Sequence, residues 1–273
     1  MPFNNHFNVK RFCRLFQQDL LINGKKYGLA ILGLSLITYV LSYMYLNGCK
    51  NSMIKYDYSI IQNYTICFGF FMMAVGVVIG TAFPDLSDKI KTSNYLLNPG
   101  STLEKITLQF LIRFGLFVPI ALAVFWICIR LAKASLVPGD SGLDPSVIPY
   151  FDYVFLITKG SGKIWETWQI LFFIFGLFSY GTYLFAGATY FKRYALVKTV
   201  IVSVIIFFAS ITFSVAMSHL FYPNETHGFT MELREFAVTE YLTSLEIFFL
   251  ALSMFSWLFF LTLAYFKLKE KEV

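Results

Sequence analysis

Apolar residues in this chain fall into six long windows, and most of the polar and charged residues lie between them. An α-helix needs about 20 predominantly apolar residues to cross a hydrocarbon core of about 30 Å. The pattern therefore predicts six transmembrane helices. Their expected boundaries are 27–46, 60–83, 106–131, 167–191, 200–221 and 245–266.

The composition supports this interpretation. Hydrophobic residues make up 57% of the chain and charged residues 14%, and the mean hydropathy is +0.64. A soluble domain of 273 residues does not need so much apolar surface to fill one core. We expect an all-α polytopic membrane protein in which residues 1–273 form a single transmembrane domain.

The segment before the first window, residues 7–22, has the pattern of an amphipathic helix. Its apolar face would hold Val9, Phe12, Cys13, Phe16 and Leu20, and its polar face Lys10, Arg14, Gln17 and Gln18. We expect it to lie in the membrane interface and to end at Asn23-Gly24, where the chain would turn into the first span. Its role is open between a specific docking element and a simple basic anchor.

Basic residues indicate the orientation, because Lys and Arg in short loops stay on the cytoplasmic side. One set of alternating segments holds fourteen of them and the other set holds six. The larger set includes both ends of the chain, so both termini are expected in the cytoplasm. The net charge of +6 is then mostly a topology signal and indicates no nucleic-acid partner.

The longest polar segment on the cytoplasmic side joins the second and third windows. Asp85 and Asp88 suit the positive end of a helix dipole, and Leu86 and Ile90 lie one turn apart on one helix face. These features predict a short helix from about Asp85 to Leu97.

The second half of this segment, which spans residues 84–105, predicts a stop and a new start. Residues 98–100, Asn-Pro-Gly, end the short helix, since the residue before a proline avoids the helical conformation. Ser101 followed three residues later by Glu104 forms a capping-box pattern. We expect it to begin a helix that continues into the third span.

Two further features concern packing and the outer loops. Gly76 and Gly80 form a GxxxG pattern that allows close helix packing, more simply within one subunit than between two. The loops at 132–166 and 222–244 lie on the outer side. The first is expected to be an ordered cap or a shallow interfacial loop, and the second one or two short helices that dip toward the membrane.

The chain shows no arrangement of residues for catalysis, a cofactor or a metal. Residues 160–163, Gly-Ser-Gly-Lys, lack the first Gly and the following Ser or Thr of a phosphate-binding loop. Arg113 lies inside the third window. It is a possible contact for an anionic substrate, although extension of its side chain to the cytoplasmic interface is the favoured interpretation.

Together these features resemble the ABC-2 type permease family, the membrane subunits of many bacterial ABC exporters. The resemblance rests on an N-terminal interfacial helix, six spans, cytoplasmic termini and the loop between the second and third spans. The matching loop elements are Asp88-Lys89, Leu96-Leu97, Asn98-Pro99, Ser101 and Glu104-Lys105. The chain departs from the family at Ser87-Asp88-Lys89 and Thr92-Ser93-Asn94, where the family often has Glu-Arg and Gly-Thr-Leu-Glu.

The resemblance implies that the loop is a cytoplasmic coupling helix that docks on a separate ABC ATPase subunit. The expected partner-binding residues are Asp85, Asp88, Lys89 and Lys91 as exposed contacts, Leu86 and Ile90 as the packed side, and Glu104 as the cap that transmits motion to the third span. It also implies a second permease subunit and a location in the bacterial inner membrane. The segment before the sixth span would correspond to the short re-entrant helices of the family.

A different class of function is also open. The chain could be a membrane scaffold or assembly protein whose cytoplasmic loop binds a partner without a cycle of ATP hydrolysis. If it is a permease, the Phe- and Leu-rich spans favour an amphipathic or lipid-like substrate.

Overall fold

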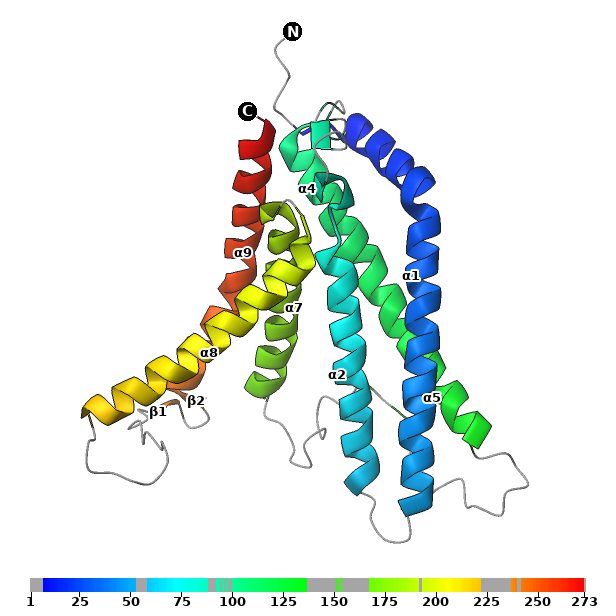
Figure 1. Ribbon diagram of the computed structural model, residues 1–273, viewed down its shortest axis with the longest axis vertical. Helices are drawn as coiled ribbons and strands as arrows, with labels where there is room; N and C mark the ends of the chain where they lie inside the picture. The colour runs from blue at the N-terminus through cyan, green and yellow to red at the C-terminus, as the bar shows by residue number, and fades with distance from the viewer. Residues whose placement is uncertain are drawn as a thin grey trace.

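A computed structural model describes residues 7–52, 58–87, 92–93, 95, 97, 100–136, 151, 153, 167–191, 193–221, 237–239 and 242–272. The fold is almost entirely helical (Figure 1). Its long helices are α1 (Val9–Ser52), α2 (Tyr58–Gly80), α4 (Thr102–Phe110), α5 (Val118–Leu136), α7 (Thr167–Tyr190), α8 (Ala195–Phe221) and α9 (Ser244–Glu272). A 3₁₀ turn, η1 (Pro84–Ser87), follows α2, and a π-helical segment, η2 (Leu111–Phe117), joins α4 to α5.

Within the described residues, five helical stretches are long and apolar enough to cross a membrane. They are Val9–Gly48, Thr102–Leu136, Trp168–Tyr190, Ala195–Met217 and Glu246–Lys271. The apolar stretch of α2 is shorter, Tyr64–Gly80. The helical membrane class is therefore confirmed, while α2 as a sixth span stays a prediction.

The expected break at Asn23-Gly24 was wrong, because α1 runs without interruption from Val9 to Ser52. Gly costs about 1 kcal/mol in a helix interior relative to Ala, which tertiary contacts can offset. Here Asn23 donates a hydrogen bond from Nδ2 to the Asp19 carboxylate one turn earlier, at 2.9 Å. Figure 1 shows the consequence, since α1 bends near its N-terminal end and continues as one helix.

The helices pack as two groups. α1, α2, α4 and α5 form one group, α7, α8 and α9 form the other, and α2 packs against α7 between them (Figure 1). Rings fill the interface of α2 and α5, where Phe125 lies 4.6 Å from Phe71 and 5.3 Å from Phe68 between ring centroids. Such aromatic pairs add to the stabilisation that comes from burial itself.

The third long helix begins as the sequence predicts. Ser101 caps α4 by accepting a hydrogen bond from the Glu104 amide, and the Glu104 carboxylate accepts one from the Ser101 amide. This capping box is confirmed. The helix continues through η2 into α5, so the expected third span lies inside one continuous helix, although the π-helical segment was not predicted.

The segment before α9 differs from the expectation. Its described residues form an antiparallel pair of strands, β1 (Ala237–Thr239) and β2 (Leu242–Thr243), where one or two short helices were predicted. β-Branched Val and Thr favour the extended backbone. Between α5 and α7, the described Tyr153 donates a hydrogen bond to the Leu122 carbonyl of α5 at 2.6 Å.

Candidate functional site

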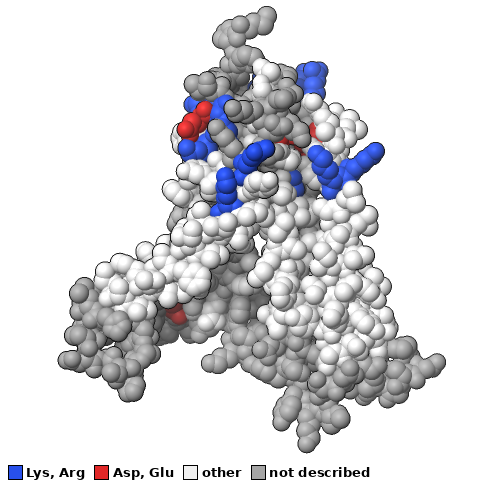
Figure 2. All heavy atoms as spheres, in the orientation of Figure 1, with Lys and Arg blue, Asp and Glu red and all other residues white. Residues whose placement is uncertain are grey.

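Cationic side chains gather at the end of the molecule where both termini lie (Figures 1 and 2). Contacts at this end bring distant segments together: Arg11 of α1 pairs with Glu104 of α4, and Lys271 of α9 donates to the Thr189 carbonyl of α7 at 2.6 Å. We refer to it as the basic end. The side chains of five of the six basic residues expected on the opposite side lie outside the described part of the chain, so the predicted segregation and a cytoplasmic position for this end stay predictions.

Glu104 is a buried and multiply hydrogen-bonded charge at the basic end. Its side chain is fully buried and accepts hydrogen bonds from the Arg11 guanidinium, with both distances 2.7 Å, and from the Asn8 amide at 2.7 Å. The Ser101 amide donates a further bond at 3.0 Å. Glu104 therefore fastens the N-terminal turns of α1 to the start of α4.

Glu104 was expected among the partner-binding residues as the cap of the third span, and its carboxylate is buried. The carboxylate is not on the surface, so it cannot be a direct contact for a docked protein in this arrangement. Its capping role is confirmed. Its link to α1 was not expected from the sequence.

Arg113 lies in η2, within the continuous helix formed by α4, η2 and α5, and connects this helix to α2. It is only 5% exposed, and its guanidinium donates to the Val78 carbonyl at 3.1 Å and to the Thr81 carbonyl at 3.2 Å. These carbonyls lie in and just after the last turn of α2, where helical partners are lacking and cations are favoured. The guanidinium carbon also lies 5.0 Å from the centroid of the Tyr27 ring of α1.

Arg113 thus contacts two other helices, α2 and α1, and its expected extension to the cytoplasmic interface stays a prediction. Its proposed contact with an anionic substrate stays a prediction, and any such substrate would meet a guanidinium that already donates two hydrogen bonds.

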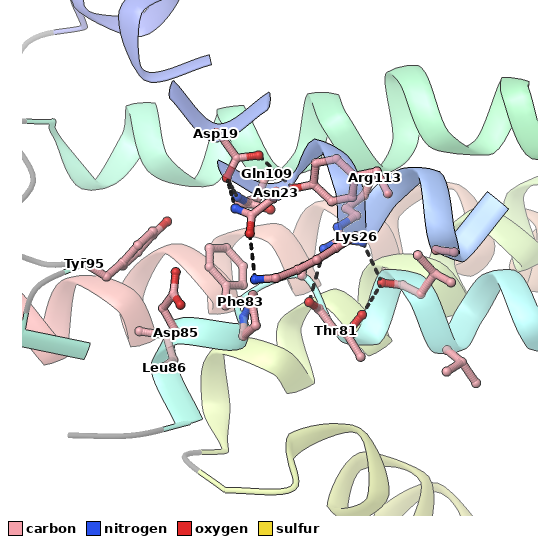
Figure 3. A pocket seen from close by; sticks show the side chains of 16 residues that line it. Asp19, Asn23, Lys26, Thr81, Phe83, Asp85, Leu86, Tyr95, Gln109 and Arg113 are labelled. Atoms are coloured by element: carbon pink, nitrogen blue, oxygen red, sulfur yellow. Dashed lines mark hydrogen bonds between the residues drawn. The ribbon is translucent and has the colours of Figure 1, made fainter. Parts of the chain in front are cut away.

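Asp19 is the centre of a third set of contacts. Its carboxylate accepts hydrogen bonds from the Asn23 side-chain amide at 2.9 Å, from the Tyr27 hydroxyl at 2.7 Å and from the Gln109 side-chain amide at 3.3 Å. Asn23 in turn accepts a hydrogen bond from Lys26 at 2.9 Å. This network joins α1 to α4 (Figure 3).

A pocket of about 270 Å³ lies among these groups, between α1, α2, η1 and α4 (Figure 3). A smaller pocket of about 80 Å³ adjoins it toward the N-terminal turns of α1. The two share Asp19, Asn23, Asp85, Tyr95 and Gln109. Among the described residues, no group of three His, Cys, Asp or Glu side chains could hold a metal ion.

The predicted coupling helix is described only in part. Pro84–Ser87 forms a 3₁₀ turn in which Leu86 is buried and Asp85 is half-buried beside the pocket. The Thr92 hydroxyl donates to the Asp85 carbonyl at 3.2 Å, and the described residues from Thr92 to Leu97 are helical. The remaining predicted contacts, Asp88, Lys89, Ile90 and Lys91, lie outside the described residues.

The glycines of the GxxxG pattern pack inside the chain. A Cβ atom at Gly76 would lie 3.0 Å from Leu184 Cδ1 of α7, and one at Gly80 would lie 2.5 Å from Leu196 Cδ1 of α8. The predicted packing within one subunit is therefore what the structure shows.

Sequence reasoning missed the residues that centre on Asp19. Their one available signal is the spacing of Asp19, Asn23 and Tyr27, which places three polar groups on one face of α1. Gln109 gives no such signal, because it is 90 residues away from Asp19.

The long apolar helices define the class of this protein as a helical membrane protein. Comparison with family models, curated proteins and solved structures finds no match.

Proposed function

We propose that this protein is the membrane-spanning subunit of an ATP-driven ABC exporter and works with a separate ATPase subunit. In this proposal α2 is the sixth span, and the segment between α2 and α4 is the coupling loop. The substrate class that suits the apolar helices is an amphipathic or lipid-like molecule. Two such subunits form the pathway in the bacterial inner membrane.

The observation that carries the proposal is the way the ends of the coupling loop are connected. Before the loop, the last carbonyls of α2 are bonded to Arg113 of the third long helix. After the loop, Glu104 holds the N-terminal turns of α1 through Arg11 and Asn8. A force on the loop would therefore act on α1, α2 and α4 together, as a device that transmits ATP-driven motion requires.

The test uses the full-length chain co-expressed with candidate ATPases that carry a phosphate-binding loop. We expect a stable complex whose ATP hydrolysis changes when the permease is present. The double variant Asp88→Lys, Lys89→Glu should keep the fold and weaken binding of the ATPase roughly a hundredfold or more, with a matching loss of stimulation, since it loses two charge-assisted contacts of about 1.5–3 kcal/mol each. The matched control is Lys269→Glu, which reverses an exposed charge of α9 at the same end.

The outcomes separate the candidate functions. If the loop variant and the control stimulate hydrolysis equally, the coupling proposal is wrong. A stable partner without any effect on hydrolysis would instead indicate the scaffold or assembly function.

A further inference from the structure

The two adjoining pockets at the basic end form one groove along α1. The larger pocket is lined by α1 from Asp19 to Ala30, which is three helical turns or roughly 16 Å. The smaller pocket extends the groove toward Leu15. Such a length suits an elongated ligand better than a compact one.

The lining changes character along the groove. Toward the basic end it holds Asp19, Lys26 and Asp85, and farther into the bundle it holds Ala30 and Val77. The helix directions establish this order, because α1 leaves the basic end while α2 approaches it (Figure 1). The groove is therefore amphipathic, with its polar part at the level where the chain leaves the apolar helices.

The edge of the groove is continuous with exposed apolar surface on α1 and α2. Val77 is 49% exposed, and one turn farther from the basic end Met73 is 65% exposed. On α1, Lys26 is exposed and Leu29, on the same face, is 70% exposed. In a membrane these surfaces contact acyl chains, so the groove is open to a lipid from the bilayer.

Two charged groups of the lining have bonding capacity left over. The Lys26 ammonium has three protons and donates one hydrogen bond, to Asn23. The half-buried Asp85 carboxylate accepts no hydrogen bond from the described side chains or backbone. Asp19, in contrast, accepts three hydrogen bonds, and Arg113 donates two from its terminal nitrogens, so that only its buried Nε has no partner among the described residues.

We propose that this groove binds one phospholipid with a primary-amine headgroup, of the phosphatidylethanolamine type. Its phosphate pairs with Lys26, its ammonium donates to Asp85, and an acyl chain follows Val77 and Met73. A primary ammonium can donate a hydrogen bond to the carboxylate, whereas the quaternary ammonium of a choline lipid cannot. A single anionic headgroup would leave Asp85 without a partner.

The proposal rests on the membrane location of the chain and is independent of the ATPase partner. The test is native mass spectrometry of the full-length protein, purified in detergent, stripped of lipid and titrated with phosphatidylethanolamine, phosphatidylcholine or phosphatidylglycerol. We expect one phosphatidylethanolamine molecule to bind at concentrations where phosphatidylcholine and phosphatidylglycerol do not bind. Asp85→Asn and Lys26→Gln should each weaken this binding roughly tenfold, the effect of losing one charge-assisted contact.

Three controls make the result specific. Lys25→Gln removes a neighbouring exposed cation that does not line the groove and should leave binding unchanged. Asp85→Glu keeps the carboxylate and should restore most of the binding lost in Asp85→Asn. Circular dichroism and size-exclusion chromatography establish that each variant is folded.

Two outcomes overturn the proposal. If all three lipids bind alike in every variant, the protein holds only non-specific boundary lipid. If free phosphoethanolamine competes as well as the intact lipid does, the groove takes a soluble solute and the acyl-chain contacts have no role.

Discussion

Glu104 shows how a single carboxylate can be buried at the start of a long apolar helix. Removing a charge from water is costly unless it is paired and hydrogen-bonded. Glu104 meets this condition through Arg11, Asn8 and Ser101, and its position in the first turn of α4 places it at the positive end of the helix dipole. The same bonds hold the N-terminal turns of α1 in place.

Replacing this carboxylate should therefore destabilise the protein. We expect Glu104→Gln to lower the free energy of unfolding by roughly 3 kcal/mol, because the variant loses the buried ion pair and leaves Arg11 without its carboxylate. Thermal unfolding in detergent measures the effect. The matched control is Glu270→Gln, which removes the carboxylate of the exposed Lys267–Glu270 pair and should leave the unfolding temperature unchanged.

If both variants shift the unfolding temperature by the same small amount, the hydrogen bonds of Glu104 do not hold the N-terminal turns of α1 in place. A limited-proteolysis assay adds a direct view, since release of the N-terminal turns in Glu104→Gln should expose the basic sequence around Arg11 and Arg14 to trypsin.

At the basic end, the sequence predicted the local contacts but not the contacts between distant segments. The bond between Ser101 and Glu104 was predictable, because a capping box lies within four consecutive residues. The partners Arg11 and Gln109 were not, because their contacts with Glu104 and Asp19 join residues 93 and 90 positions apart. No local pattern encodes a pairing that only the packing of α1 on α4 creates.

At the scale of elements, close approach between α7 and α8 depends on a glycine. A Cβ atom at Gly187 of α7 would lie within 3 Å of three Thr199 atoms of α8, including the Thr199 Cβ at 2.9 Å. Thr199 is buried near the start of α8, and its hydroxyl donates to the Ala195 carbonyl at 2.8 Å. A side chain at position 187 must therefore displace the first turns of α8.

Two alanine substitutions in the same helix should have opposite effects. Gly187→Ala should destabilise the protein by roughly 1–3 kcal/mol, the usual cost of overpacking. Gly176→Ala should be neutral or stabilise it by up to about 1 kcal/mol, since nothing lies within 4 Å of the added Cβ and alanine favours the helix. Thermal unfolding of both variants measures the difference; a stabilised Gly187→Ala would mean that α8 is not packed there.

The sequence predicts the helices where their residues form long apolar windows. Each of the six windows falls largely within helical structure, and five of these helical stretches are long and apolar enough to cross a bilayer, as about 20 consecutive apolar residues predict. The sequence did not predict three features of the fold, each for a physical reason. α1 continues through Asn23-Gly24 because side-chain bonds offset the glycine, η2 has no sequence signature, and the short strands before α9 lie in a segment of mixed polarity.

At the scale of the whole molecule, the basic end is common to α1, α4, α7 and α9 (Figures 1 and 2). An even number of crossings accounts for two termini at the same end, and the five long apolar stretches supply an odd number. α2 therefore decides the topology. If it crosses the bilayer, both termini and the coupling loop face the same compartment.

Single cysteines can test the crossing of α2 directly. In a background where Cys13, Cys49, Cys67 and Cys128 are replaced, we introduce Lys55→Cys before α2, exposed Pro84→Cys after it, and exposed Lys269→Cys near the C-terminus. Because basic segments stay inside, a membrane-impermeant thiol reagent should label only Lys55→Cys in intact cells. Pro84→Cys and Lys269→Cys should react only after the cells are permeabilised. If Lys55→Cys and Pro84→Cys react from the same side, α2 does not cross, and the loop cannot serve as a cytoplasmic coupling element between two spans.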